Sequence, residues 1–341
     1  MNFRRKHTIE TPAKSKETHS GKQDPRIYWL LFLCLIAALP AVVLSYLQGK
    51  RWETAVKERA DRQAMLVARE IAAEIGRQVE DNARVMEALA KLVEIRGTLD
   101  PDVLQKMVTA QRAPFIPFSS LMYIANAKGT AVAYDPPFDK FGTPNVGTDY
   151  SDRDYYKELV RTEGAGPAII GPVRMGRRSH APNVQTAAAA HDLPGRFWAF
   201  TQGSIDLTTL QPEVEQIVAG TPDLKVVVTS KDGKVFIHPE KNALEEMRDL
   251  SNYPLFQPPQ NPNGEFRSGV DEPGVAVRAA VLSILQRGIH WRVVVYRPEA
   301  LTAAEVGPIH RQIWGILVAS LLAAYIPVAL VWKAKRAKEG K

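Results

Sequence analysis

The sequence predicts an α+β protein in which one long helix precedes two units of antiparallel strands, with an apolar helix at each end. Three observations support this fold class. Two long segments carry no charged side chain, a third follows a helical period without proline, and the strand-like segments after it fall into two groups that each open with a hairpin signal. Composition adds little, because 45% hydrophobic and 24% charged residues are ordinary for a folded protein.

Two apolar segments are long enough to cross a membrane. Residues 27–47 are 21 residues without a charged side chain, and residues 313–332 are another 20. At about 1.5 Å of rise per residue, either helix would span a hydrocarbon core of roughly 30 Å. Both have aromatic residues near their ends and one internal proline, which membrane helices favour or tolerate. We therefore expect two transmembrane helices rather than two buried core helices.

The basic residues indicate the orientation of these helices. Residues 1–26 hold seven Lys or Arg against three Asp or Glu, and residues 333–341 hold five against one, so the two tails carry +8 and the rest of the chain about −1 of the net charge of +7. A nucleic-acid groove would need this charge on the folded part, and we expect no nucleic-acid partner. Because basic flanks stay in the cytoplasm, we expect both termini there and residues 48–312 in the periplasm, on a bacterial inner (plasma) membrane.

The first apolar helix is expected to remain as an anchor. Its apolar region is longer than that of a usual signal peptide, and Ser45, Tyr46 and Leu47 make a poor cleavage site. The one cysteine of the chain, Cys34, lies inside this helix. The periplasmic part is therefore expected to contain no disulfide and to depend on its hydrophobic core.

Residues 48–97 are predicted to form a stalk helix. Between Trp52 and Ile95 there is no proline and a single glycine, Gly76, and nine residues recur at three- and four-residue spacing. These nine are Ala64, Ala68, Ile71, Ile75, Val79, Asn82, Met86, Leu89 and Val93. We expect the lower part of this stripe to pair across a homodimer, with Asn82 setting the register, and the upper part to cover a sheet. The alternative is that the whole stripe packs on its own chain.

Residues 98–218 are predicted to form the first and larger strand unit. It opens with a short helix and then a hairpin whose turn runs from Asn126 to Gly129. Ser151 is expected to open a helix, with Asp154 as its capping-box partner. The helices are expected at residues 101–111 and 207–218, and the strands at residues 120–127, 130–134, 167–173, 184–190 and 197–205. The four alanines from Ala187 to Ala190 predict a buried strand with small side chains facing a cavity or a neighbour.

Residues 219–312 repeat the hairpin-first pattern in a smaller unit. Lys231, Asp232 and Gly233 form the turn signal between its first two strands. Strands are expected at residues 225–230, 234–238, 265–269, 275–284 and 290–296. A helix from about residue 298 is expected to lead into the second apolar segment.

Three motifs resemble the double-Cache family of periplasmic sensor domains, which are tandem PAS-like units. The stretch Gly147-Thr-Asp-Tyr-Ser-Asp-Arg-Asp-Tyr-Tyr-Lys157 is similar to a helix start in that family, and Gly203-Ser-Ile-Asp206-Leu207 is similar to the end of its first unit. Asp232-Gly-Lys-Val-Phe-Ile-His-Pro239 is similar to its second hairpin. The resemblance covers residues 48–312. It implies a membrane-distal unit that binds a small molecule and a membrane-proximal unit that usually does not.

The resemblance also implies a set of ligand-binding residues. Amino-acid-binding members use an Arg, two aromatic residues and a later Asp, which fall here on Arg153, Tyr155, Tyr156 and Asp206. An arginine fork suits a carboxylate, an aspartate accepts from an ammonium or hydroxyl group, and aromatic rings supply burial. Tyr123, in the first expected strand, is a further candidate.

This sequence departs from the amino-acid binders in two places. Tyr155 stands where they have Trp, and residues 171–178 are basic where they carry a Tyr-x-Asp. We therefore expect an anionic metabolite, such as a carboxylate, held by Arg153 and Arg174, rather than an α-amino acid.

No other chemistry is predicted. The histidines lack the spacing of metal ligands, and no nucleotide-binding or nucleophile motif is present, so we expect no enzyme, no cofactor and no metal site. Nine residues follow the second apolar segment. The expected function is a sensory input protein that signals through a separate cytoplasmic or membrane partner. The alternatives are a truncated or split histidine kinase, diguanylate cyclase or chemoreceptor, and a periplasmic binding or scaffold module without signalling.

Overall fold

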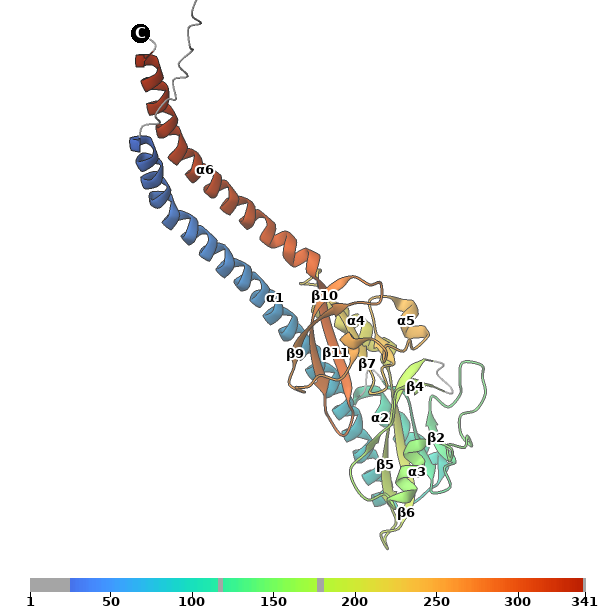
Figure 1. The fold of residues 1–341 in the computed structure, drawn as a ribbon. Coiled ribbons are helices and arrows are strands. Elements are labelled where there is room, and N and C mark those ends of the chain that lie inside the picture. The colour runs from blue at the N-terminus through green and yellow to red at the C-terminus, as the bar shows by residue number, and fades with distance from the viewer. Residues whose placement is uncertain (1–24, 116–118, 177–180, 340–341) are drawn as a thin grey trace, which may run out of the picture. The chain divides into compact units, whose positions relative to one another are not determined.

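The computed structural model describes residues 25–115, 119–176 and 181–339, so the predicted basic tails lie partly outside it. The chain divides into two compact units. The helical unit contains the chain up to Glu53 and from Gly307 onward, and the sheet-bearing unit runs from Thr54 to Val306. Both β-sheets belong to the sheet-bearing unit (Figure 1).

The helical unit consists of the beginning of α1 (Pro25–Arg96) and most of α6 (Glu299–Glu339). These two helices approach closely at Gly49, where a Cβ would lie 2.1 Å from Cδ1 of Ile313. Among the described residues, one helix is long and apolar enough to cross a membrane, the segment Glu299–Ala334, which contains an 18-residue stretch with a mean hydropathy of 2.2. It contains the second predicted span. The first predicted span, residues 27–47, lies within α1 and stays a prediction.

In the sheet-bearing unit, α1 packs along both sheets. All nine residues of the predicted stripe are buried, including Ala64 near its start. Asn82 is 0% exposed and lies against Gly203 of the chain's own first sheet. The expectation that this stripe pairs across a dimer is therefore wrong, as is a register role for Asn82, because the sheets already cover these side chains. A homodimer would have to use other residues.

The first sheet is antiparallel with strand order β2-β1-β6-β5-β3, and β4 also pairs with β5. The elements are α2 (Pro101–Phe115), β1 (Ser119–Asn126), β2 (Ala131–Asp135), α3 (Asp154–Arg161), β3 (Ile169–Ile170), β4 (Arg174–Met175), β5 (Pro182–His191) and β6 (Phe197–Asp206). The predicted hairpin is confirmed, with Gly129 N–H donating to the Asn126 carbonyl at 3.0 Å. One face of this sheet packs on α1, where the Thr201 hydroxyl donates to the Met86 carbonyl at 2.8 Å.

The start of α3 differs from the prediction. The helix begins at Asp154 with Arg153 as its N-cap, and no side chain caps it. Ser151 does not form a capping box, because its N–H and its hydroxyl both donate to the Asp149 carboxylate, at 2.8 and 3.1 Å. This local turn delays entry into the helix by three residues.

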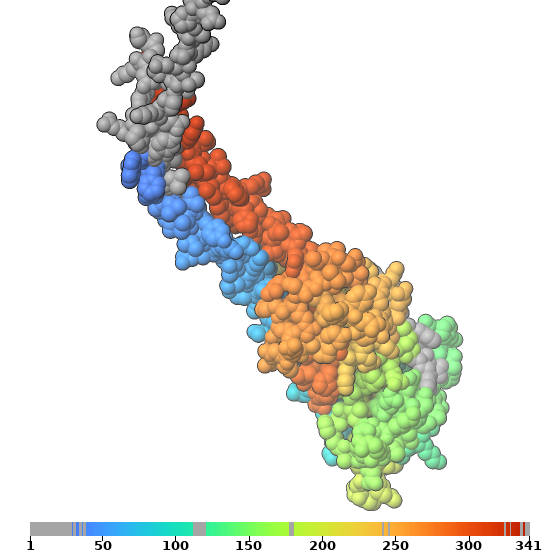
Figure 2. All heavy atoms as spheres, in the orientation of Figure 1, coloured from blue at the N-terminus to red at the C-terminus, as the bar shows by residue number. Residues whose placement is uncertain are grey.

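The second sheet is also antiparallel, with strand order β8-β7-β11-β10-β9. Along the chain it is preceded by η1 (Leu207–Thr209) and α4 (Leu210–Val218). Its strands are β7 (Lys225–Thr229), β8 (Val235–Ile237), β9 (Glu265–Val270), β10 (Ala276–Ile284) and β11 (Trp291–Pro298). Between β8 and β9 the chain forms α5 (Lys241–Glu245) and η2 (Pro254–Phe256). Short helices α5 and η2 occupy a region for which the sequence predicted no structure. In Figure 2 the orange atoms of this sheet directly adjoin the green atoms of the first.

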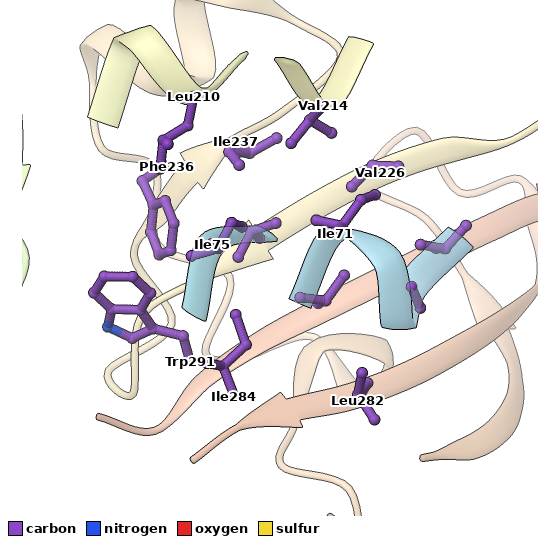
Figure 3. Packing of buried hydrophobic residues seen from close by; sticks show 14 of the residues in the cluster. Ile71, Ile75, Leu210, Val214, Val226, Phe236, Ile237, Leu282, Ile284 and Trp291 are labelled. Carbon is purple, nitrogen blue, oxygen red and sulfur yellow. The ribbon is translucent and has the colours of Figure 1, made fainter. Parts of the chain in front are cut away.

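A shared core joins the two sheets beneath α1. Figure 3 shows Ile71 and Ile75 of α1 packed between α4 and the second sheet. Phe236 and Trp291 meet edge to face, with ring centroids 4.8 Å apart. The same buried cluster includes Val173, Val184 and Ile205 from the first-sheet region. Because both sheets contribute to one close-packed core, a displacement of one sheet is transmitted to the other.

Candidate functional site

A small polar cavity lies on the face of the first sheet opposite α1. Its walls are four tyrosines, a group of strand amides and the side chain of Arg153. The cavity volume is about 20 Å³, which is room for roughly one water molecule. The side chains that line the cavity therefore fill most of its space.

The tyrosine wall is centred on Tyr123 of β1. Its ring stacks on Tyr134 and Tyr150, with centroid distances of 5.1 and 4.6 Å and interplanar angles of 11° and 15°. Its hydroxyl shares a hydrogen bond of 2.7 Å with the hydroxyl of Tyr155 from α3. Burial raises the pKa of Tyr123 and of Tyr155, so both remain neutral phenols that can donate and accept hydrogen bonds.

The amide wall comes from alternate residues of two neighbouring strands. Asn183 and Gln185 lie on β5, and Gln202 and Ser204 lie on β6, where Gln185 is paired directly with Ser204. All four are buried. Gln185 Nε2 donates to Asn183 Oδ1 at 2.8 Å, and Gln202 Nε2 donates to Ser204 Oγ at 2.9 Å. These residues were missed in the sequence, although polar side chains at period two within apolar strands were a signal for them.

Arg153 supplies the charge of the site. It lies at the N-cap of α3 with an extended backbone, and its half-buried side chain reaches the cavity wall. Among the residues that the structure describes, it is the one charged side chain of the lining, and no carboxylate accompanies it. An arginine fork of this kind can bind a carboxylate or another planar anion.

Three of the six predicted ligand residues line the cavity, namely Arg153, Tyr155 and Tyr123. The structure does not bring the other three there. The Tyr156 hydroxyl donates to the Ala127 carbonyl at 2.9 Å, and Arg174 forms an ion pair with Asp154. Asp206 accepts from the N–H and the hydroxyl of Thr208, at 2.9 and 2.6 Å, and so caps η1. Within the described part of the chain, no group of three or more metal-ligating side chains is found.

The architecture is thus two tandem antiparallel sheets on one long helix, with a polar cavity in the first sheet. A family model described as a Cache domain, in its double form, matches residues 52–306. The chain therefore belongs to the double-Cache family, which confirms the resemblance found in its motifs. Domains of this family bind ligands rather than catalyse reactions, and they are the extracytoplasmic sensor domains of membrane receptors.

Solved structures show the same fold. The ligand-binding domain of the Pseudomonas aeruginosa amino acid chemoreceptor PctB, in complex with L-Arg, is 18% identical, with a TM-score of 0.56 over 71% of this chain and 97% of that one. The periplasmic sensory domain of the Campylobacter jejuni chemoreceptor Tlp1 is 12% identical, with a TM-score of 0.56 over 72% of this chain and 98% of that one.

A third structure is longer than the matched region. An extracellular ligand binding receptor from Desulfohalobium retbaense is 14% identical, with a TM-score of 0.54 over 69% of this chain, and the match spans 40% of the receptor. At these identities the likeness shows the fold alone. A search of curated proteins found no match.

Proposed function

We propose that this chain is a membrane-anchored sensory input protein whose first sheet unit binds a small anionic ligand in the periplasm. The observation that carries the proposal is the cavity of the first sheet, in which buried polar side chains surround one arginine. Burying so many polar groups on the inner face of a sheet lowers stability compared with an apolar face. Convergent polar groups in a pocket are typical of ligand sites.

The charges around the cavity favour a ligand without a cationic group. An ammonium group would lose its hydration there without gaining a carboxylate partner from the described lining. A carboxylate would instead meet Arg153, and its remaining atoms would meet the hydroxyls and amides of the walls. We therefore propose a carboxylate or a similar organic anion, and not an α-amino acid of the kind named for PctB.

Ligand entry requires the cavity to expand, because about 20 Å³ cannot hold an organic molecule. Two residues of its lining, Tyr123 and Tyr155, are joined by a hydrogen bond between their hydroxyls. Tyr155 belongs to α3, which has eight residues and buries only Tyr155 and Leu159. We propose that the ligand replaces this hydrogen bond and displaces α3 from the sheet, which is the first step of the response.

The second sheet unit is proposed to relay this response rather than to bind a ligand. Its corresponding face is filled by an apolar cluster that includes Val227, Phe256 and Val294. In this proposal residues 98–218 are the membrane-distal unit and residues 219–312 the membrane-proximal unit, between spans at residues 27–47 and 313–332. The output passes to a signalling partner, and two copies of the chain form a dimer.

A thermal-shift screen of the full-length protein in detergent micelles tests the ligand class. Mono-, di- and hydroxycarboxylates are compared with α-amino acids, since a bound ligand raises the melting temperature. We expect carboxylates to raise the melting temperature. Arg153→Gln should weaken their binding at least tenfold, because the partner anion stays desolvated. Arg161→Gln is the matched control, because Arg161 lies on the same helix but pairs with the exposed Glu158. Unchanged affinity in Arg153→Gln, or binding of amino acids alone, would refute the proposal.

A further inference from the structure

The β10–β11 hairpin of the second sheet contacts α1 at an unusual residue. Gly76 is the single glycine between Trp52 and Ile95, and a glycine inside a helix lowers helix stability. A Cβ at residue 76 would lie 2.5 Å from Oε1 of Gln286, at the end of a flexible side chain of the hairpin turn. Gly76 thus leaves room for the Gln286 side chain against α1.

The turn itself contains a second unusual residue. Ile289 N–H donates to the Gln286 carbonyl at 2.9 Å, and φ is +46° at Arg287 and +80° at Gly288. Positive φ at both central positions defines a type I′ turn, which favours Asn-Gly or Gly-Gly. The left-handed conformation is unfavourable for arginine, and such positions often mark a functional constraint. The side chain of Arg287 therefore needs an explanation.

The Arg287 guanidinium binds two glutamates of α1 at once. Nε and Nη2 donate to the two oxygens of Glu80 at 2.7 and 2.8 Å, and Nη1 donates to Glu87 Oε1 at 2.6 Å. Glu80 and Glu87 lie seven residues apart, which is about two helical turns, so they share one side of α1. The side chains of Arg287 and Glu80 are each 17% exposed and that of Glu87 is 35% exposed, so water screens the pair with Glu80 less than the pair with Glu87.

Glu87 extends this contact into the first sheet. Its Oε1 also accepts the N–H of Ala168 at 2.8 Å. Ala168 directly precedes β3, a two-residue strand that pairs with β5. Just after β3, Gly171 N–H donates at 2.7 Å to the carbonyl of Gln185, whose side chain lines the cavity. A short series of contacts thus connects the hairpin of the second sheet to the amide wall of the first.

We propose that Arg287 is a positioning residue that couples the β10–β11 hairpin to the cavity-bearing sheet, by holding the Glu87 carboxylate on the Ala168 N–H group. β11 ends at Pro298, and α6 begins at the next residue. A displacement of β3 and β5 at the cavity is therefore passed to the strand that leads into α6. The coupling does not depend on the proposed ligand, and only its use in signalling rests on the proposed function.

Hydrogen exchange of the full-length protein in detergent micelles, without ligand, tests the coupling. The informative variant is Arg287→Gly, because glycine suits a type I′ turn and removes the guanidinium without straining the hairpin. We expect the amides of residues 168–171 to exchange about tenfold faster, as when a charged hydrogen bond is lost, while β10 and β11 stay protected. Arg84→Met is the matched control, because it removes the exposed arginine that also pairs with Glu80 and should leave these amides unchanged.

A second variant, Glu87→Gln, tests whether Arg287 acts through Glu87. Glutamine keeps an acceptor for the Ala168 N–H group but loses the ion pair with Arg287. If the two residues act as one unit, the double variant exchanges no faster at residues 168–171 than Arg287→Gly alone. Wild-type exchange of these amides in Arg287→Gly, or independent effects of the two changes, would overturn the proposal. Loss of protection throughout the second sheet would also overturn it, because Arg287 would then be a folding residue.

Discussion

The two sheet units share one scaffold and differ in the side chains of one face. Their strand orders are β2-β1-β6-β5-β3 and β8-β7-β11-β10-β9, so each strand of the first sheet corresponds to the strand at the same place in the second. The hairpin turns correspond as well. Gly129 and Gly233 have φ of +90° and +84°, and their carbonyls accept the N–H of Tyr150 and of Leu250, each at 2.9 Å. A tyrosine of the cavity thus corresponds to a leucine of the second core.

Other counterpart positions change in the same direction. Gln202 of β6 pairs with Tyr123 of β1, and Val294 of β11 pairs with Val227 of β7. Gln202 and Val294 therefore occupy corresponding positions in the two sheets. Gln185 corresponds to Ala279 in the same way. The residues of the first sheet line the cavity, and their counterparts belong to a buried apolar cluster. The difference teaches that the backbone alone does not make a ligand site. On the same backbone arrangement, the corresponding face carries polar side chains in the first sheet and apolar side chains in the second.

Exchanging residues between counterpart positions gives the largest expected effect. Val294→Gln buries an amide in the apolar cluster without a prepared partner, and we expect the free energy of unfolding to fall by about 3 kcal/mol. The reverse change, Gln202→Val, should alter the free energy of unfolding by less than about 1 kcal/mol while weakening ligand binding. Chemical denaturation followed by circular dichroism measures both values. Equal losses in the two variants would remove the basis of the comparison.

Asn82 tests the same contrast on the opposite face of the first sheet. It is fully buried, and neither its amide nitrogen nor its oxygen has a hydrogen-bond partner among the described groups. Asn82→Leu should raise the free energy of unfolding by about 1 kcal/mol, because it removes a desolvated amide and roughly keeps the volume. Asn82→Ala is the control that also removes the amide but leaves a cavity, and it should be the less stable of the two. A less stable Asn82→Leu protein would show that the amide is bonded after all.

The Arg287 contact predicts the smallest effect, a dependence of stability on pH. The hydrogen bond from Arg287 lowers the pKa of Glu80 from its ordinary value of 4.5 to about 2. Because the folded-state pKa is the lower one, the Glu80 contribution is fully present above about pH 5 and is lost as the pH falls toward about 2. Melting temperatures of Glu80→Gln should therefore depend less on pH in this range than those of the wild type. Glu58→Gln, which affects only an exposed pair with Arg62, should keep the wild-type slope, and the same slope in all three proteins would contradict the assignment.

Local signals predicted most of the fold. The helical period of α1 and the turns before Gly129 and Gly233 are properties of short segments, and the structure confirms the long helix and both hairpins. Helices α5 and η2 were not predicted, because proline and asparagine in that region indicate turns and tertiary packing overrides them. The stripe of α1 was predicted to be buried, but its periodicity alone cannot distinguish a partner helix from the chain's own sheets.

The site was less predictable than the fold. Gln185 and Gln202 meet only because β5 and β6 are neighbours in a particular register, which no single segment specifies. The family motif indicated Arg153 and Tyr155 as ligand residues, and both lie in the cavity wall. It did not indicate where the side chain of Asp206 points, and that carboxylate is occupied in capping η1.

The central claim, that the first sheet unit holds the ligand and the second does not, can be tested by fluorine NMR of the full-length protein labelled with 3-fluorotyrosine. Resonances are assigned by single Tyr→Phe changes. The carboxylates that raise the melting temperature in the thermal-shift screen are then titrated into the labelled protein. The account predicts that Tyr123, Tyr150 and Tyr155 shift with saturation, since the ligand replaces the contact between Tyr123 and Tyr155. Tyr253 and Tyr296 of the second unit should move little. Saturable shifts confined to Tyr253 and Tyr296, with the first-unit resonances unchanged, would contradict it.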